Sequence, residues 1–277
     1  MSIVLNEYAW AKDHIEKCDL GDNAFETLCR VAKYYKANGA KKSVIKKNLE
    51  DFLLRCDPYV STVLWSKTLD KAVKIGNKYP LVDIDKIVIT KPEMDTILSA
   101  GSRNGGIQVQ RLAFTLLCVA KYMLRVAPNT NGWVSIPEDQ IMKMANLKPS
   151  YKRQNLLYGQ LIEAGLLQPS KKIDNLNVRV LYIKDGEPAL DVCDFRDLGN
   201  QFMKYIGKPY YVCQNCGLTV KAPKNAKLGK MKYCQECAVK IEVKNRVDCV
   251  MRSRKPARSA NTDVRCVNIK HDDNDVA

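Results

Sequence analysis

The sequence predicts a mainly α-helical, multidomain protein, and three observations lead to this prediction. Apolar residues recur at helical spacing through most of the first 200 residues. The middle of the chain interrupts these helices with short alternating segments that are typical of strands. Towards the C-terminus, four cysteines form two closely spaced pairs, which predicts a small metal-bound module. A chain of 277 residues that is 46% hydrophobic can bury one to three domain cores.

The first part of the chain, residues 1–100, is predicted to be a helical N-terminal domain. Helices are expected at Val4–Lys17, after Asp22-Asn23, from Lys42, and at Val60–Gly76. Residues 81–85 and 87–89 look like two short strands of a hairpin. Thr90 is expected to cap a further helix, with Glu93 completing a capping box. Three helices before a hairpin are compatible with a helix-turn-helix variant, although many small helical domains share this pattern.

A glycine-rich segment, Gly101–Gly106, is predicted to be a linker, and a second domain is expected at residues 107–200. Its predicted order is helix, short strand, helix, turn, helix, strand, loop and strand. These elements are expected at residues 108–125, 133–136, from 137, 149–164, 166–169 and 178–183. The loop before the last strand is polar and basic.

This order of elements resembles the winged-helix family of helix-turn-helix domains over roughly residues 107–185. The segment Leu161-Ile162-Glu163-Ala164-Gly165-Leu166-Leu167 is similar to the one with which many winged helices end the recognition helix and enter the wing. The resemblance implies that the third helix of this domain can enter the major groove of DNA.

Polar and cationic side chains are predicted to face outward at the start of that third helix and on the wing. On the helix they can contact phosphates or base edges, and on the wing they can contact phosphates. The predicted nucleic-acid-binding residues here are Lys148, Ser150, Lys152, Arg153, Asn155, Lys171, Lys172 and Arg179. The alternative is a solvated helix face and hairpin, and some winged helices bind proteins instead.

Cys213, Cys216, Cys234 and Cys237 have the spacing C-x2-C-x17-C-x2-C, within a module predicted at residues 205–240. Two residues between cysteines let both sulfurs face one ion, and four thiolates complete a tetrahedral zinc shell without an open position for catalysis. The predicted cofactor is therefore one structural Zn2+ ion. Disulfides and an iron-sulfur cluster are the alternatives. The motif resembles zinc ribbons and treble-clef-like knuckles, which bind nucleic acid or proteins.

Basic residues fill the loop of this module and the residues that follow it. The loop holds Lys221, Lys224, Lys227, Lys230 and Lys232, and a basic, flexible tail is predicted at residues 241–277, with Arg252, Arg254 and Lys255 as candidate contacts. The alternative is a solubilising surface around a small metal-bound core.

The net charge of +15 favours a polyanionic partner, and it is unevenly distributed. Residues 1–105 hold 17 Lys+Arg and 14 Asp+Glu, and residues 106–200 hold 12 and 9, so each part has a net charge of +3. Residues 201–277 hold 16 and 7, a net charge of +9. The C-terminal part therefore supplies more than half of the excess.

Catalytic patterns are not found in the sequence. The chain has two histidines, no Walker loop, no GxSxG and no HExxH, so it is not expected to be an enzyme. No secretory signal pattern and no bilayer-spanning apolar run is found, so a soluble, cytoplasmic protein is expected.

The full layout resembles uncharacterised phage or mobile-element proteins of Gram-positive bacteria. The resemblance implies a DNA-binding regulator of replication or transcription, with DNA favoured over RNA because few aromatic residues accompany the basic segments. The alternative hypothesis is a protein-binding inhibitor or adaptor that acts on a nucleic-acid enzyme such as a CRISPR effector or a polymerase.

Overall fold

The structure is a computed structural model, and it describes residues 3–100, 106–171, 177–224 and 228–253. The described part contains ten α-helices and small sheets, with 59% of residues in helices. The prediction of a mainly α protein is therefore confirmed. Among the described helices, none is long and apolar enough to cross a bilayer.

The first four helices pack around their own hydrophobic core. They are α1 (Glu7–Lys17), α2 (Ala24–Ala37), α3 (Lys42–Cys56) and α4 (Thr62–Lys78). Asn6 caps α1 by accepting a hydrogen bond from the Ala9 amide at 2.7 Å, and Asn23 caps α2 in the same way. The core lies on the inward faces of α2, α3 and α4 and includes Leu28, Val31, Ala32, Ile45, Leu49, Phe52, Leu69 and Ala72.

A buried carboxylate connects this helical unit with the segment that follows it. Glu7 is buried and accepts hydrogen bonds from Lys33 Nζ at 2.9 and 3.0 Å. It also accepts a hydrogen bond from the Val82 amide at 2.9 Å. A buried charge is tolerated only when it is paired and hydrogen-bonded, so these contacts hold α1, α2 and residue 82 together.

The prediction of a hairpin at residues 81–89 is wrong. Strand β1 (Ile87–Thr90) pairs antiparallel with β5 (Pro188–Val192), with Ile87 opposite Val192. Within residues 81–85 the structure describes only a single bridge, between Asp83 and Asn6. Local alternation cannot reveal a partner about 100 positions away, and here the distant strand supplies the hydrogen bonds.

Half of the capping box predicted at the start of α5 (Lys91–Ala100) is present, because the Thr90 hydroxyl donates to the Lys184 carbonyl oxygen at 3.0 Å and not back to the helix. Glu93 accepts a hydrogen bond from the Thr90 amide at 2.8 Å. It is fully buried and also accepts from Lys121 Nζ at 2.8 Å and from the Lys184 amide at 3.1 Å. One carboxylate therefore fixes the start of α5, helix α6 and the connection into β5.

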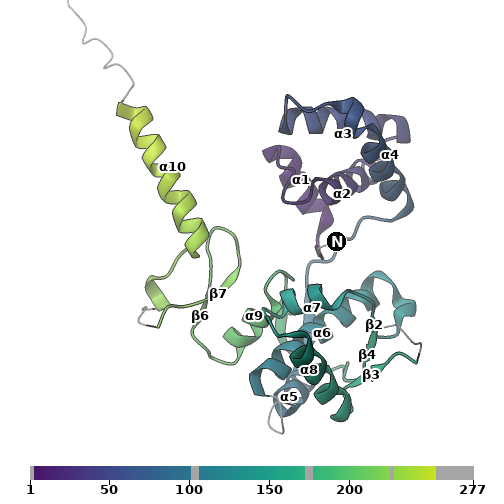
Figure 1. Ribbon diagram of the computed structural model, residues 1–277, viewed down its shortest axis with the longest axis vertical. Helices are drawn as coiled ribbons and strands as arrows, with labels where there is room; N and C mark the ends of the chain where they lie inside the picture. The colour runs from purple at the N-terminus through teal and green to yellow at the C-terminus, as the bar shows by residue number, and fades with distance from the viewer. Residues whose placement is uncertain (1–2, 101–105, 172–176, 225–227, 254–277) are drawn as a thin grey trace, which may run out of the picture.

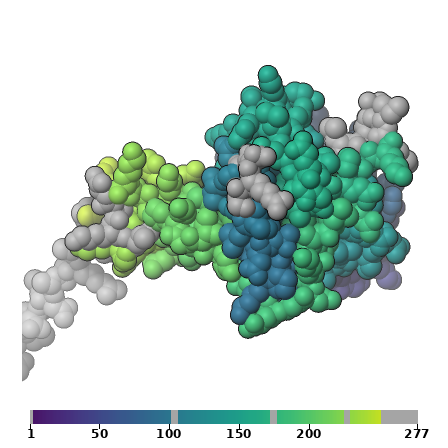
Figure 2. Space-filling view, turned by 90° about the horizontal axis from the view of Figure 1, so that it is seen from below, coloured from purple at the N-terminus to yellow at the C-terminus, as the bar shows by residue number. Residues whose placement is uncertain are grey.

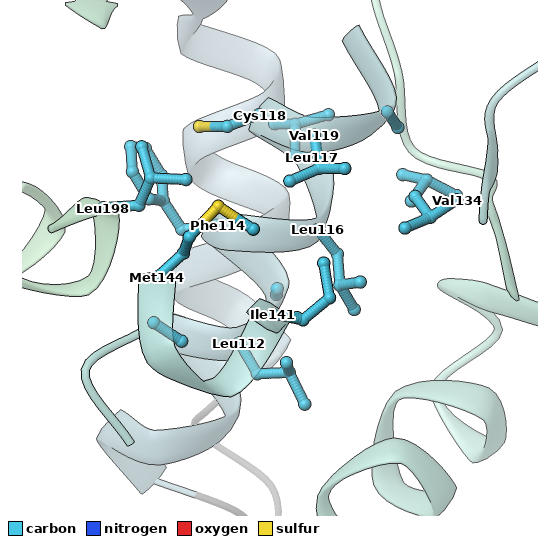
Figure 3. Packing of buried hydrophobic residues seen from close by; sticks show 14 of the residues in the cluster. Leu112, Phe114, Leu116, Leu117, Cys118, Val119, Val134, Ile141, Met144 and Leu198 are labelled. Atoms are coloured by element: carbon cyan, nitrogen blue, oxygen red, sulfur yellow. The ribbon is translucent and has the colours of Figure 1, made fainter. Parts of the chain in front are cut away.

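Helix α6 (Gly106–Val126) is the centre of the larger core. After it come η1 (Pro128–Thr130), β2 (Trp133–Val134), α7 (Glu138–Met144), α8 (Tyr151–Glu163), β3 (Leu167–Pro169) and β4 (Val178–Val180). The three strands form an antiparallel sheet in the order β2-β4-β3. Figure 3 shows how α6 meets other elements, with Ile141 and Met144 from α7, Val134 from β2 and Leu198 from α9.

Elements on both sides of the predicted 101–106 linker share one core. Leu5, β1 and α5 belong to the same hydrophobic cluster as α6 and the elements that follow it. The domain limits remain a prediction, but the packing joins residues 87–100 to the middle of the chain.

The last elements form a lobe beside this core. Helix α9 (Leu198–Tyr205) packs on α6, and the chain continues through β6 (Tyr210–Val212), β7 (Thr219–Lys221), η2 (Leu228–Lys230) and α10 (Gln235–Ser253). Figures 1 and 2 both show the β6–α10 part projecting away from the rest of the molecule. Its attachment through α9 determines where the cysteine motif sits.

Gly199 sets the approach of α9 to the end of α7. A Cβ atom at this position would lie 1.9 Å from the Ala145 carbonyl oxygen, which also accepts a hydrogen bond from Arg111 Nε at 3.1 Å. Because this oxygen belongs to the backbone of a tight turn, a side chain at residue 199 would force α9 away from the end of α7.

Gly199→Ala is therefore expected to lower the free energy of unfolding by about 2–3 kcal/mol, the upper part of the range for overpacking. Gly159→Ala is the matched control, because Gly159 also lies within a helix but has open space around it. The control is expected to be neutral or slightly stabilising, since alanine is the better helix former. Urea denaturation followed by circular dichroism measures both changes. Equal stability of the two variants would contradict this packing.

Candidate metal centre

The four cysteines predicted as metal ligands come together in one cluster. Their Sγ atoms all lie within 4.8 Å of one another, with Cys213, Cys234 and Cys237 buried and Cys216 partly buried. Cys213 and Cys216 flank the turn after β6, and the other pair lies at the start of α10. The cluster can therefore hold a metal ion.

Local hydrogen bonds shape the cluster around its sulfur atoms. The Gly217 amide donates to the Cys213 carbonyl oxygen at 2.9 Å, and Gly217 has a φ of +75°, a conformation that glycine adopts without strain. The Cys234 amide donates to Cys213 Sγ at 3.2 Å, and Asn215 Nδ2 donates to Cys237 Sγ at 3.3 Å. Donors aimed at sulfur stabilise the thiolate form that binds metals.

The pKa values of the cysteines reflect the same environment. Burial alone would raise the pKa of the Cys213 thiol, but three backbone N–H donors of the module outweigh it and lower this pKa to about 6. Burial raises the pKa of Cys216 to about 12. A cation among the four sulfurs would favour deprotonation of all of them, because its positive charge stabilises each thiolate.

One distance between two sulfur atoms matches the spacing around a tetrahedral ion. Metal–sulfur bonds of about 2.3 Å in a tetrahedron place the sulfurs about 3.8 Å apart. Cys216 Sγ and Cys234 Sγ are 3.8 Å apart. A disulfide would require about 2.05 Å, so the arrangement suits a shared ion and not a pair of disulfides.

Polar side chains of the α9 region attach the cysteine module to the larger core. Arg196 Nη2 donates to the Cys216 carbonyl oxygen at 2.7 Å. Asp197 is buried and accepts a hydrogen bond from the Thr219 amide, and Asn200 Nδ2 donates to the Thr219 carbonyl oxygen at 2.8 Å. The amide and the carbonyl group of Thr219 thus both attach β7 to the α9 region.

These attachment residues were missed from the sequence. Asp197 lies just before a helix and Asn200 lies within it. From sequence alone, the first is interpreted as an N-cap and the second as a surface residue. Asn215 could have been noticed, because it lies between the two cysteines of the first pair. No local signal shows that residues 196–200 contact a segment about 20 positions later.

The predicted nucleic-acid residues of the middle region lie at the start of α8. Lys148, Lys152 and Asn155 have exposed side chains. Ser150 is the N-cap of α8 and accepts from the Arg153 amide at 3.4 Å, so its hydroxyl has a structural role as well. Arg153 is exposed but donates to Gln108 Oε1 at 3.2 and 3.3 Å.

Two further predicted residues lie on or just after the strands next to α8. Lys171 is exposed two residues after β3, whereas Lys172 lies outside the described residues. Arg179 is half-buried on β4, opposite Gln168, and its Nε donates to the Asn131 carbonyl oxygen at 2.9 Å. Arg179 is thus partly engaged in holding the turn before β2.

The predicted lysines of the cysteine module form a second, separate group. Lys221, Lys224, Lys230 and Lys232 are exposed in the segment between the two cysteine pairs. Figure 1 shows β7 and α10 away from α8, so these lysines do not extend the α8 surface. Lys227, Arg254 and Lys255 lie outside the described residues, as does the side chain of Arg252.

Comparison with known proteins adds no relative: no family model, no curated protein and no solved structure matches the chain.

Cys234→Ser is expected to abolish metal binding, because three sulfurs leave a structural site incomplete and metal binding supplies the folding free energy of such modules. Residues 210–238 should then exchange amide hydrogens rapidly, while residues 3–200 remain protected. Elemental analysis and hydrogen exchange measure the two effects. Cys249→Ser is the control, since this exposed cysteine of α10 lies outside the cluster. A Cys234→Ser protein that keeps one metal ion per chain would refute the assignment.

Asp197→Ala is expected to loosen the module from α9 and to cost about 1–3 kcal/mol, because it leaves the buried Thr219 amide without an acceptor. Faster hydrogen exchange at Thr219 is the direct readout. Asp191→Ala removes an exposed ion pair with Lys86 instead, and a change below about 1 kcal/mol is expected for it. Unchanged protection of Thr219 in Asp197→Ala would rule out this attachment.

Proposed function

We propose that the protein is a zinc-containing winged-helix protein that binds duplex DNA, with a role in the control of replication or transcription. The single observation that carries the proposal is the sheet order β2-β4-β3 together with the exposed, cationic start of α8. In a winged helix the first strand pairs with the third, and the hairpin of the second and third strands is the wing. The chain order α6, β2, α7, α8, β3, β4 agrees with that plan.

The packing of α8 supports its proposed role as the recognition helix. Leu157, Tyr158 and Leu161 hold one face of α8 against the core. The opposite face is open and carries Lys152 and Asn155 along a shallow depression of about 410 Å³. An asparagine can make paired hydrogen bonds with adenine, and a lysine can contact guanine or a phosphate. A helix held on one side and polar on the other suits insertion into a groove.

Zinc is the metal that the chemistry of the cluster favours. Four thiolates in a closed tetrahedral arrangement are the donor set of structural zinc sites. When bound, the ion would crosslink the turn after β6 with the start of α10 and leave no position for a substrate. The exposed lysines around it then form a rigid cationic surface for phosphates.

Duplex DNA is favoured over single-stranded nucleic acid by the residues at the start of α8. Tyr151 is the one aromatic residue there that is well exposed among the described residues of that helix. Recognition of unpaired bases relies on several aromatic platforms, which this surface does not offer.

A second candidate function, a protein-binding adaptor or inhibitor, is favoured by a different surface. Tyr59, Val63 and Leu64 at the start of α4 are 97%, 82% and 82% exposed. Neighbouring exposed apolar side chains of this size are typical of protein contacts. Affinity capture from nuclease-treated host lysate separates the two functions. A protein partner that the wild type captures and the Val63→Ser/Leu64→Ser variant does not capture favours the adaptor function.

Charge reversal at α8 tests the proposed DNA site. Lys148→Glu/Lys152→Glu, named the α8 variant, is expected to weaken binding to duplex DNA by about tenfold or more, because it replaces attraction to phosphates with repulsion. Lys91→Glu/Lys204→Glu carries the same change in net charge on other helices and should lose much less affinity. Fluorescence anisotropy with a labelled duplex compares them. Equal losses in both variants would place the DNA contact elsewhere.

A further inference from the structure

The modest net charge of the first 105 residues conceals a strongly basic segment. Residues 41–78 contain nine Lys+Arg and four Asp+Glu, a net charge of +5. Residues 1–40 contain five and six, and residues 79–105 contain three and four, so each of these neighbours has a net charge of −1. The excess of positive charge in the N-terminal part is thus confined to residues 41–78, which form α3, α4 and the turn between them.

The fold gathers part of this charge into an open groove of about 1110 Å³ between α3 and α4. The groove runs between the N-terminal half of α3 and the C-terminal half of α4, because the two helices pack as a hairpin. Its lining residues are Lys42, Ser43, Lys46, Lys47, Glu50, Asp70, Val73 and Lys74.

Three of the four lysines in the groove have free charges. Lys46 is paired with Asp70 at 2.7 Å, a partly exposed ion pair between α3 and α4 at the groove. Lys42, Lys47 and Lys74 are exposed, and none of them is in an ion pair with another described residue. Lysines that are exposed and close together repel one another unless an anion lies between them.

The start of α3 adds to this positive potential. Its N-cap is Lys41, which makes no side-chain capping hydrogen bond, and no acidic residue occupies the first turn. Helix N-termini carry partial positive charge and are stabilised by acids, so lysines there oppose helix stability. Such an arrangement is suited to an external anion, which can accept hydrogen bonds from free amides and from the Ser43 hydroxyl.

We infer that the α3–α4 groove is a second nucleic-acid contact surface, which binds the phosphate backbone of duplex DNA without reading its sequence. The chemistry favours phosphates over bases because the lining contains no aromatic residue. In Figure 1 the α3–α4 pair and α8 lie at different ends of the molecule, so the groove does not continue the α8 surface. The choice of DNA as the polyanion rests on the proposed function, whereas the groove itself does not depend on α8.

Two separate phosphate-binding surfaces on one chain have a mechanistic consequence. One surface raises the effective DNA concentration at the other, so the two together hold a long duplex more tightly than either alone. A duplex that is too short to reach both surfaces should not show this gain.

The test compares full-length variants in binding to a long labelled duplex over a series of salt concentrations. Lys42→Glu/Lys47→Glu/Lys74→Glu is the groove variant, and Lys12→Glu/Lys91→Glu/Lys204→Glu is a control with the same net charge spread over three other helices. All six lysines are exposed, so circular dichroism should show both proteins folded. The groove variant is expected to bind at least tenfold more weakly than the control, with a salt slope that is smaller by about two to three, since each phosphate contact contributes about 0.9.

Each outcome separates this inference from the proposed function. A groove variant that binds like its control overturns the inference, and loss of binding in the α8 variant alone leaves the proposed function standing. Loss in the groove variant alone supports the inference and removes α8 as the DNA site. Wild-type protein that does not bind duplex DNA overturns both the inference and the proposed function. Tighter binding to a labelled polyglutamate peptide than to DNA, lost in the groove variant, overturns the inference in favour of an acidic protein.

Discussion

Helix α6 is buried around its whole circumference, and every residue from Leu112 to Ala120 is shielded from solvent. Helices α5, α7, α8 and α9 and strands β1, β2 and β4 all contact it. A helix that is apolar on all sides requires neighbours on all sides, so α6 dictates where these elements lie. The orientation of α8 and the attachment point of the cysteine lobe both follow from this packing.

Buried ionic groups then fix the segments that α6 alone would not position. Glu93 joins α5, α6 and the entry to β5, and Glu7 joins the N-terminal helices to residue 82. Asp197, just before α9, joins that helix to β7. In each case one carboxylate accepts hydrogen bonds from distant parts of the chain. The charged groups that remain at the surface, on α8 and between α3 and α4, are thereby displayed on a rigid frame.

Local patterns in the sequence predicted most of the helices and the cluster of four cysteines that can hold a metal ion. Helical periodicity and capping residues act over a few positions, and two Cys-x-x-Cys pairs specify a site without knowledge of the fold. The pairing of β1 with β5 could not be found this way, because its two strands are about 100 residues apart. The attachment of the module through Asp197 and Asn200 escaped for the same reason. The net charge of +3 over the first 105 residues did not reveal the groove. Averaging over a long segment removed the contrast in net charge between α3–α4 and its neighbours.

We propose that the cationic surfaces of the fold bind the backbone of duplex DNA. The most direct measurement is the equilibrium binding of wild-type, metal-loaded protein to a labelled DNA duplex at several salt concentrations, beside an RNA duplex of the same sequence. We expect tight binding to DNA that falls steeply as salt rises, and weaker binding to the A-form RNA, whose deep and narrow major groove excludes a helix. Weak binding to both duplexes, or affinity that does not change with salt, would contradict it.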